Sequence, residues 1–294
     1  MKIVVSGGAG RLGQFVVREM ADGGHEILSL DTTQPTGQAC PWLPADLLDT
    51  KNLIKALDGA DAVVHLARVR FPYTSNGFDP ASGLWKTPDV VRDAERFSHN
   101  VTIAYNILAA SLEAGVKKIV CGSSLAIYGL YYPLRPDSPD YLPIDEKHPL
   151  RPQDPYGISK QVGESLCDSF ARKSSLQIAS LRFSGIATEA QYPTLLKRSK
   201  DPLCRGTGAL WSYIDVRDAA IACRLALETN FSGHKTFNIG APKTIMKEDT
   251  SDLLKRYLTE VKIVKKDLEN NWSGYDTTRA ETLLGFRAVH LLEN

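Results

Sequence analysis

Short apolar runs alternate with helical patterns through the first half of the chain, and this alternation restricts the fold more than any other feature. The runs IVV, AVVHL and KIVC lie at the centres of strands expected in residues 2–6, 61–66 and 117–124. Continuous apolar runs are typical of strands that are buried on both faces of a parallel sheet. Helices are predicted between them, in residues 12–20, 51–57 and 89–114. This order predicts an α/β fold in which helices cover both faces of a parallel sheet.

The second half of the chain is less regular. Prolines crowd residues 133–155, which predicts a loop there, and residues 184–211 show no periodic pattern and are expected to be irregular. Further strands are expected at 176–183 and 236–239, and further helices at 156–172, 215–228, 247–258 and 277–284. We therefore expect residues 1–183 and 212–240 to form one domain, and residues 184–211 and 241–294 to form a small C-terminal substrate-binding lobe.

The charge balance argues against several classes of partner. With 35 basic and 34 acidic residues among 294, the formal net charge is +1. Such a balance gives no electrostatic reason to expect nucleic acid or an anionic membrane as a partner. No apolar run reaches the roughly 18 residues of a membrane helix. Met1 and Lys2 lead directly into the first strand, so no signal peptide is expected.

The cysteines indicate a reducing compartment. Their number is odd, their spacings are wide, and no two form a C-x-x-C pair; they are Cys40, Cys121, Cys167, Cys204 and Cys223. Small thiols in a cytoplasmic protein explain this pattern best. No cluster of histidine, cysteine, aspartate and glutamate has the spacing of metal ligands, so no metal is expected.

A glycine-rich loop, SGGAGRLG in residues 6–13, joins the first expected strand to the first expected helix. It fits G-x-x-G-x-x-G at Gly7, Gly10 and Gly13, and G-x-G-x-x-G when read from Gly8. Glycine at these points permits a tight turn, lets the backbone approach a pyrophosphate, and lets the helix pack closely on the strand. Free N–H groups at the start of the helix favour phosphate. The loop predicts a dinucleotide site in a Rossmann-type, doubly wound parallel sheet.

An acidic residue stands where such a loop requires one. Asp31 follows a strand expected in residues 25–30 and lies 18 residues after Gly13. A carboxylate there accepts hydrogen bonds from the adenosine ribose hydroxyls and repels a 2′-phosphate. No arginine or lysine that would bind such a phosphate occurs among the next residues, which are Thr32, Thr33 and Gln34. NAD rather than NADP is therefore the expected cofactor.

Tyr156 and Lys160 form a Y-x-x-x-K pair in the segment PYGISK. Residues four apart share one face of a helix, so the Lys160 ammonium is expected beside the Tyr156 phenol, where it favours the phenolate. A phenol in this setting can exchange a proton with a secondary alcohol or a ketone. Ser124 ends a predicted strand, at the sheet edge where α/β proteins bind ligands, and its hydroxyl can hold the substrate oxygen.

With these motifs in place, the chain resembles an extended short-chain dehydrogenase/reductase of the NAD-dependent epimerase/dehydratase family over nearly its whole length. The segments that carry the resemblance are SGGAGRLG, ADL at 45–47, HLA at 65–67, NV at 100–101, SSLAIYG at 123–129, YGISK at 156–160, LR at 181–182, YIDVRD at 213–218 and FNIG at 237–240. The resemblance implies NAD as cofactor, a sugar-like small molecule as substrate, and a homodimer formed through the helices at 89–114 and 156–172.

The resemblance also implies roles for individual residues. Tyr156 would act as general acid/base, Lys160 would favour its phenolate and bind the nicotinamide ribose, and Ser124 would donate a hydrogen bond to the reacting oxygen. The expected cofactor-binding residues are Gly7, Gly10, Arg11, Leu12, Gly13, Asp31, Asp46, Leu47, Leu66, Ala67, Asn100, Tyr156 and Lys160. The expected substrate-binding residues are Arg68, Ser124 and Ser184.

The sequence leaves the reaction open. Ser124 is followed by Leu125 and Ala126 rather than by the Asp-Glu pair of the family's dehydratases, which argues against water elimination. Gly185 stands where nucleotide-sugar epimerases usually carry asparagine, and no arginine precedes Tyr213 in the segment ALWSY. The preferred interpretation is an NAD-dependent dehydrogenase of a sugar or sugar acid. The alternatives are a nucleotide-diphosphate-sugar 4-epimerase with tightly bound NAD and a non-catalytic NAD-sensing protein.

Several other side chains receive specific expectations. Arg68 departs from the HLAA pattern of the family and, with Arg70, can meet a substrate carboxylate or phosphate, although solvated arginines are common. His65 follows an apolar run and is expected to be a hydrogen-bonded core residue, whereas His148 lies among prolines and is expected to be exposed. Candidates for the wall of the substrate pocket are Tyr131, Tyr132 and Tyr141.

Overall fold

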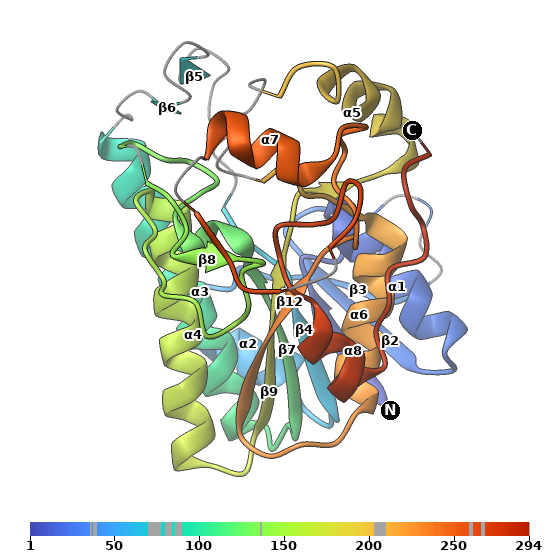
Figure 1. Cartoon of the computed structure of the whole chain (residues 1–294). Helices are drawn as coiled ribbons and strands as arrows, with labels where there is room; N and C mark the ends of the chain where they lie inside the picture. Colours follow the sequence, from blue (N-terminus) through green and yellow to red (C-terminus); the bar gives the residue numbers. More distant parts are fainter. Residues whose placement is uncertain are drawn as a thin grey trace.

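A parallel sheet of seven strands forms the centre of the computed structural model (Figure 1), which describes residues 1–35, 37, 40–69, 78–79, 84–85, 90–135, 137–202, 210–258, 261–265 and 268–293. The strands are β1 (Lys2–Ser6), β2 (Glu26–Asp31), β3 (Trp42–Pro44), β4 (Ala62–His65), β7 (Lys118–Ser124), β9 (Gln177–Phe183) and β12 (His234–Ile239). Their order is β12-β9-β7-β4-β1-β2-β3, and each neighbouring pair is parallel. The sequence pattern does not predict β3, which is only three residues long.

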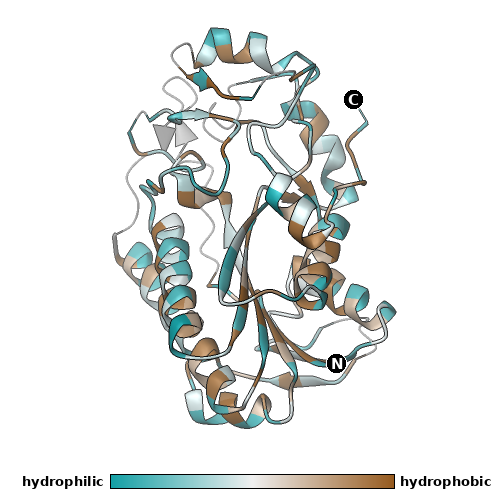
Figure 2. Ribbon diagram, turned by 60° about the horizontal axis from the view of Figure 1, so that its bottom comes forward, coloured by the Kyte–Doolittle hydropathy of each residue, from teal (hydrophilic) through white to brown (hydrophobic). Residues whose placement is uncertain are grey.

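Helices cover both faces of the sheet, as Figure 1 shows. One face carries α1 (Arg11–Asp22), α6 (Val216–Glu228) and α8 (Thr278–Leu284), and the other carries α2 (Thr50–Ala56), α3 (Val90–Glu113) and α4 (Pro155–Lys173). Ile3 and Val5 pack with the first set, whereas Val4 packs with the second. The strands in the middle of the sheet carry the hydrophobic colour in Figure 2. The expected Rossmann-type, doubly wound parallel sheet is therefore confirmed.

The order of the strands determines where a ligand can bind. From β1 the chain adds β2 and β3 on one side and β4, β7, β9 and β12 on the other. Ligands of α/β sheets bind at the carboxyl ends of strands, beside the point where the winding reverses. The strands that end at this point are β1, β4 and β7, and the residues next to their ends include Gly7, Leu66 and Ser124.

The second half of the chain forms a third hydrophobic cluster around residues such as Tyr128, Leu142, Trp211, Met246 and Leu253. Its elements and the short pairs beside it are η2 (Leu125–Tyr128), β8 (Tyr141–Leu142), β10 (Ile186–Ala187), β11 (Ile214–Asp215), α7 (Thr250–Tyr257) and β13 (Lys262–Ile263). β10 pairs with β11, and β8 pairs with β13. A short antiparallel pair, β5 (Phe78–Asp79) and β6 (Leu84–Trp85), precedes α3 in the chain.

The expectation that residues 184–211 are irregular is wrong for their first half. This part contains β10, the 3₁₀ turn η3 (Glu189–Gln191) and α5 (Tyr192–Arg198). The side chain of Gln191 accepts a hydrogen bond from the N–H of Thr188 (3.1 Å), which caps the start of this segment. A helix of seven residues makes only about two turns, so its periodicity does not stand out in the sequence.

The last helix returns to the sheet. Ala280 and Leu284 of α8, and Phe286 after it, pack in the same cluster as α1 and α6. The helix ends at Gly285 with φ 68°, as the glycine predicts. By their packing, Ala280, Leu284 and Phe286 belong with the sheet. The division of the chain into a domain and a substrate-binding lobe stays a prediction.

Two histidines test the expectations about burial. His65 is buried, and its Nδ1 lies 2.7 Å from Ser6 Oγ, as expected of a core residue. His148 is also buried, so the expectation of an exposed side chain is wrong: its Nε2 accepts from the N–H of Asp140 (3.0 Å), because the proline-rich loop folds around it. Among the described residues, no helix is long and apolar enough to cross a membrane.

Candidate active site

Two cavities meet at the glycine loop, over the carboxyl ends of the central strands. The first has a volume of about 440 Å³ and reaches from the glycine loop to the ends of β7 and β9 and to α5. The second has a volume of about 670 Å³ and extends along the ends of β2 and β4. Both are lined by Gly7, Gly10, Leu66 and Arg68, so one elongated ligand can occupy both.

The backbone of the glycine loop lies closer to its neighbours than side chains would permit. Gly7 has φ 78°, and a Cβ there would come within 2.7 Å of the backbone nitrogen of Ala67. A Cβ on Gly13 would come within 2.0 Å of the carbonyl oxygen of Gly7. Gly10 is the N-cap of α1 and provides no side-chain cap for its first N–H groups, and Gly10, Arg11, Leu12 and Gly13 all line the first cavity. This arrangement is a cradle for a phosphate group.

Asp31 lies in the second cavity at the end of β2. Its Oδ2 accepts from the N–H of Ala9 (3.1 Å), and its Oδ1 accepts from the N–H of Thr33 (3.2 Å). The carboxylate is thus held against the glycine loop. Besides Gly7 and Gly10, the same cavity is lined by the expected cofactor-binding residues Asp46, Leu47, Leu66 and Ala67.

Tyr156 and Lys160 lie in the first turns of α4, as predicted. The side chain of Asp154 caps this helix by accepting from the N–H groups of Tyr156 and Gly157, at 3.0 Å each. Lys160 Nζ donates to the carbonyl oxygen of Gly122 (2.6 Å) and lies 5.7 Å from the centre of the Tyr156 ring. Burial lowers the pKa of Lys160, with a smaller opposing effect from Tyr156.

Ser124 shares the first cavity with Tyr156 and Lys160. It is buried at the end of β7, and its Oγ accepts from the N–H of Ala126 (3.2 Å) as the cap of η2. That bond uses the oxygen as an acceptor and leaves the hydroxyl proton for another partner. The three residues expected to be catalytic are therefore neighbours in one cavity.

The expected substrate-binding residues also line this cavity. The guanidinium carbon of Arg68 lies 5.2 Å from the centre of the Tyr156 ring. Ser184 is only 5% exposed, and its Oγ has no hydrogen-bond partner in the described part of the chain. A buried, unpartnered hydroxyl in a cavity indicates a missing polar partner. Arg70 lies outside the described residues.

Asn100 is the expected cofactor-binding residue that reaches neither large cavity. Its Oδ1 accepts from the N–H of Val69 (2.8 Å), and it lines a small pocket of about 30 Å³ beside Lys160. Asn100 thus holds the segment that carries Arg68.

Several residues of the first cavity are not predicted from the sequence. They include Gln191, Thr194, Leu195, Arg198, Trp211, Ser212 and Ile245. Tyr131 and Tyr132, which are candidates for the pocket wall in the sequence, also line this cavity. Tyr141 does not line the cavity; its ring packs on His148, with ring centres 4.9 Å apart. Thr194, Leu195 and Arg198 are not predicted to line the cavity, because the sequence does not predict α5, the helix that carries them.

Nothing in the described part of the chain resembles a metal centre. No group of three or more histidine, cysteine, aspartate and glutamate residues is arranged to hold a metal ion there. The described cysteines, Cys40, Cys121, Cys167 and Cys223, form no disulfide, and Cys204 lies outside the described residues.

Comparison with known proteins identifies the family. Residues 3–240 match the sequence model of the NAD dependent epimerase/dehydratase family. The chain belongs to this family. The family and the class of NAD-dependent enzyme expected from the sequence are therefore confirmed.

Individual members of the family differ in reaction. The UDP-glucose 4-epimerase of Corynebacterium glutamicum is 28% identical over 272 residues, which are 82% of this chain and 75% of that protein. The L-arabinose 1-dehydrogenase (NAD(P)(+)) of Haloferax volcanii is 26% identical over 215 residues, which are 71% of this chain and 76% of that protein. A structure of a short-chain dehydrogenase/reductase superfamily protein from Agrobacterium tumefaciens with bound NAD is 24% identical and superposes with a TM-score of 0.72, covering 99% of this chain and 94% of that one. At this identity the structural likeness shows the fold.

Proposed function

We propose that the protein is an NAD-dependent oxidoreductase that transfers a hydride between nicotinamide and a secondary alcohol of a sugar or sugar acid. The observation that carries the proposal is the meeting of Tyr156, Lys160 and Ser124 in one cavity at the carboxyl end of β7. A phenol with a fixed cation beside it and a donor for the substrate oxygen can exchange a proton with a secondary alcohol. These three side chains supply those groups.

The described residues fit NAD. The glycine loop packs so closely on its neighbours that a Cβ at Gly7 or Gly13 would collide with backbone atoms, and the start of α1 offers N–H groups to a pyrophosphate. Asp31 is followed in the second cavity by Thr32, Thr33 and Gln34, none of which is basic. A 2′-phosphate would meet the carboxylate with no basic side chain among these three residues to compensate, which favours NAD over NADP. When bound, NAD supplies the carbon that accepts or returns the hydride.

Tyr156 moves the proton in the proposed reaction. Its phenolic oxygen accepts the proton of the substrate hydroxyl as the alcohol is oxidised, and returns a proton when a ketone is reduced. One N–H of Lys160 is already bound to Gly122, so the ammonium has a fixed position, and its other N–H groups remain for the phenol oxygen and a ribose hydroxyl. Ser124 donates its hydroxyl proton to the substrate oxygen.

The charge of the first cavity supports a substrate with an anionic group. Its described lining contains no aspartate or glutamate, while its cationic residues are Arg11, Arg68, Lys160 and Arg198. A concave site lined by one sign of charge concentrates ligands of the opposite sign. Arg68, beside Tyr156, is the residue we propose to meet a substrate carboxylate, and Ser184 is proposed to hydrogen-bond a substrate hydroxyl.

A nucleotide-diphosphate-sugar 4-epimerase is the second candidate. The similarity to a UDP-glucose 4-epimerase favours it, and the same phenol, ammonium and hydroxyl would serve both reactions. Gly185 and the segment before Tyr213 favour the dehydrogenase, because they lack the asparagine and arginine expected of such epimerases.

A substrate screen followed by NADH absorbance separates the two candidates. The panel contains aldoses, their uronic acids and UDP-sugars, each with NAD. We expect NADH to accumulate in proportion to substrate consumed, with a uronic acid preferred over the matching aldose. Interconversion of UDP-sugars without net NADH would establish the epimerase instead. Binding of NAD with no turnover across the panel would favour the NAD-sensing alternative.

We also propose a cytoplasmic homodimer formed through α3 and α4, which lie side by side in Figure 1. Large apolar side chains are exposed on these helices: Tyr105 at 49%, Leu112 at 37% and Ile158 at 36%. Exposed apolar patches often mark protein interfaces. Sedimentation of the wild type and of Tyr105→Glu tests the homodimer. We expect the wild type to be a dimer and Tyr105→Glu to be a monomer. A monomeric wild type would contradict the proposal.

A further inference from the structure

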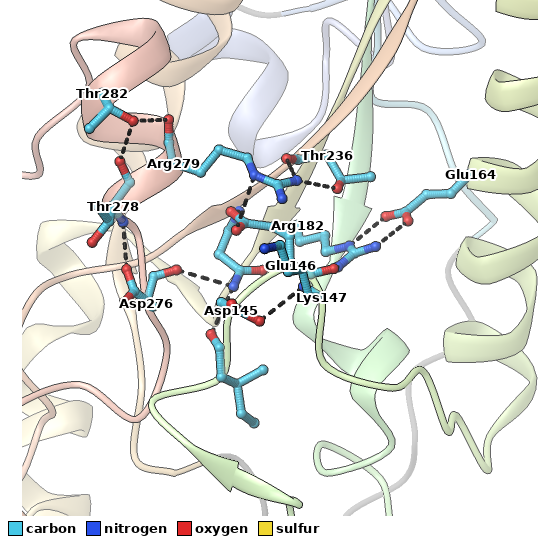
Figure 3. A network of polar contacts seen from close by, with 12 residues as sticks. Asp145, Glu146, Lys147, Glu164, Arg182, Thr236, Asp276, Thr278, Arg279 and Thr282 are labelled. Carbon is cyan, nitrogen blue, oxygen red and sulfur yellow. Dashed lines mark hydrogen bonds and ion pairs between the residues drawn. The ribbon is translucent and has the colours of Figure 1, made fainter. Parts of the chain in front are cut away.

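Glu164 forms a third member of the stripe that carries Tyr156 and Lys160. The three residues are spaced four apart on α4 and therefore share one face of the helix. The Glu164 carboxylate accepts from Ser123 Oγ (2.6 Å) and from both Nε (2.9 Å) and Nη2 (2.7 Å) of Arg182 on β9. Figure 3 shows this two-pronged pair between Glu164 and Arg182. Both side chains are buried.

Arg182 is held from its other side as well. Its Nη1 donates to Tyr128 Oη (2.7 Å), and its guanidinium carbon lies 5.2 Å from the centre of that ring. Tyr128 Oη in turn donates to Asn238 Oδ1 on β12 (2.8 Å). Tyr128 ends η2, the turn that Ser124 caps. The ion pair thus contacts Ser123 near the end of β7 and Tyr128 at the end of η2, the turn that follows this strand.

The consequence concerns the last three residues of β7. Lys160 holds the carbonyl of Gly122, Glu164 holds the side chain of Ser123, and Ser124 comes next. Both anchors belong to α4, the helix that also carries Tyr156. We propose that Glu164 is a positioning residue, which through Ser123 fixes Ser124 relative to Tyr156.

A purely stabilising role explains the pair less well. A buried ion pair often gives no more stability than apolar residues of similar volume. The pair can matter more through the position of a reacting group, because a displacement of about 1 Å in such a group can reduce the rate about 100-fold. Glu164 is also no free base, since both of its oxygens accept hydrogen bonds from Arg182. The inference rests on the proposed function, because it needs Ser124 and Tyr156 to act together on one substrate oxygen.

Ser123→Ala is the sharpest test, because it removes one hydroxyl and leaves the buried Glu164–Arg182 pair intact. With a substrate from the screen, we expect kcat to fall about 10- to 100-fold, while the Kd for NAD and the Tm stay close to those of the wild type. Ser180→Ala is the matched control: it removes a buried serine hydroxyl on β9 that lies 2.8 Å from His234 Nε2. We expect this control to retain kcat within about twofold of wild type.

A crystal structure of Ser123→Ala gives a second readout that needs no substrate. We expect Ser124 Oγ to shift relative to Tyr156 by more than about 0.5 Å, the tolerance within which catalytic groups are held. An unmoved Ser124 with wild-type kcat would overturn the inference, as would a raised KM at unchanged kcat, which indicates direct substrate contact by Ser123. These results are distinct from failure of the proposed function, which Tyr156→Phe with full turnover would show.

Discussion

At the scale of single residues, several polar groups of the site already have fixed partners. Lys160 donates to Gly122, and Asp31 and Ser124 accept from backbone N–H groups near them. Groups that are ordered in advance lose little conformational freedom when a ligand binds. Single substitutions here should therefore change specificity or rate more than they change the fold.

Asp31 is expected to set the preference for NAD over NADP. In Asp31→Ser, we expect NADP binding to strengthen about 10-fold or more relative to NAD binding. The reason is that repulsion between the carboxylate and a 2′-phosphate weakens binding by roughly 1–4 kcal/mol, the lower value for a solvent-exposed pair and the higher for a partly buried one. Calorimetric titration with both dinucleotides measures this. Asp46→Ser, an exposed carboxylate in the same cavity, is the control and should keep the preference for NAD. An unchanged ratio of the two Kd values in Asp31→Ser would contradict the assignment.

His65 is expected to make stability depend on pH. Burial, together with the charge of Lys160, lowers the pKa of His65 to about 3. Below pH 6.5 the unfolded chain binds a proton there that the folded chain does not, so stability is full above pH 6.5 and falls as the pH drops toward about 3. The maximal slope is about 1.4 kcal/mol per pH unit.

The variant His65→Asn isolates this contribution. Urea unfolding between pH 7 and pH 4.5 should give a smaller decrease in the free energy of unfolding for the variant than for the wild type. Equal slopes for the two proteins would rule out His65 as the titrating group.

At the scale of elements, replacing a glycine by alanine should change the stability of the protein in opposite directions in the glycine loop and in α4. Gly13→Ala places a Cβ within 2.0 Å of the carbonyl oxygen of Gly7, so we expect a loss of roughly 1–3 kcal/mol in stability and weaker NAD binding. Gly163→Ala on α4 meets nothing within 4 Å, and alanine should stabilise the helix by roughly 0.5–1 kcal/mol. Thermal unfolding and NAD titration of both variants check this. Similar Tm changes in both would contradict the close packing at Gly13.

Some helices and strands of this protein are predicted from the sequence and others are not. Strands with long apolar runs and helices with several turns, such as β7 and α3, are predicted because each pattern repeats within the element. β3 and α5 are missed, because three and seven residues are too few to show a periodic pattern. Asp31, Tyr156 and Lys160 are predicted because their spacing is local. The pair Glu164–Arg182 is not, because it depends on the packing of α4 on β9.

At the scale of the whole molecule, residues 286–290 pack on α6 and on the hydrophobic cluster beside it. Asp218 on α6 is fully buried, and its carboxylate accepts from the N–H groups of Val289 and His290 (3.0 and 2.9 Å). Phe286 packs in the same cluster as β1 and α6. The end of the chain is therefore part of the fold that holds the cofactor site.

Phe286→Ala should accordingly destabilise the whole protein. We expect a loss of roughly 3–5 kcal/mol in the free energy of unfolding, because a fully buried aromatic side chain is removed. Val289→Ala, at a side chain that is 66% exposed, should change it by no more than about 0.5 kcal/mol. If both variants unfold at the same denaturant concentration as the wild type, the segment does not contribute to the main core.

In the proposed reaction, the protein transfers a hydride between nicotinamide and substrate, and Tyr156 acts as the general acid/base. The most direct test compares turnover and NAD binding in wild type and Tyr156→Phe, which differ by one hydroxyl. We predict that kcat falls about 10²- to 10⁴-fold, the usual contribution of a general acid/base, while the Kd for NAD changes little. Undiminished turnover in Tyr156→Phe, with NAD still bound, would contradict the account.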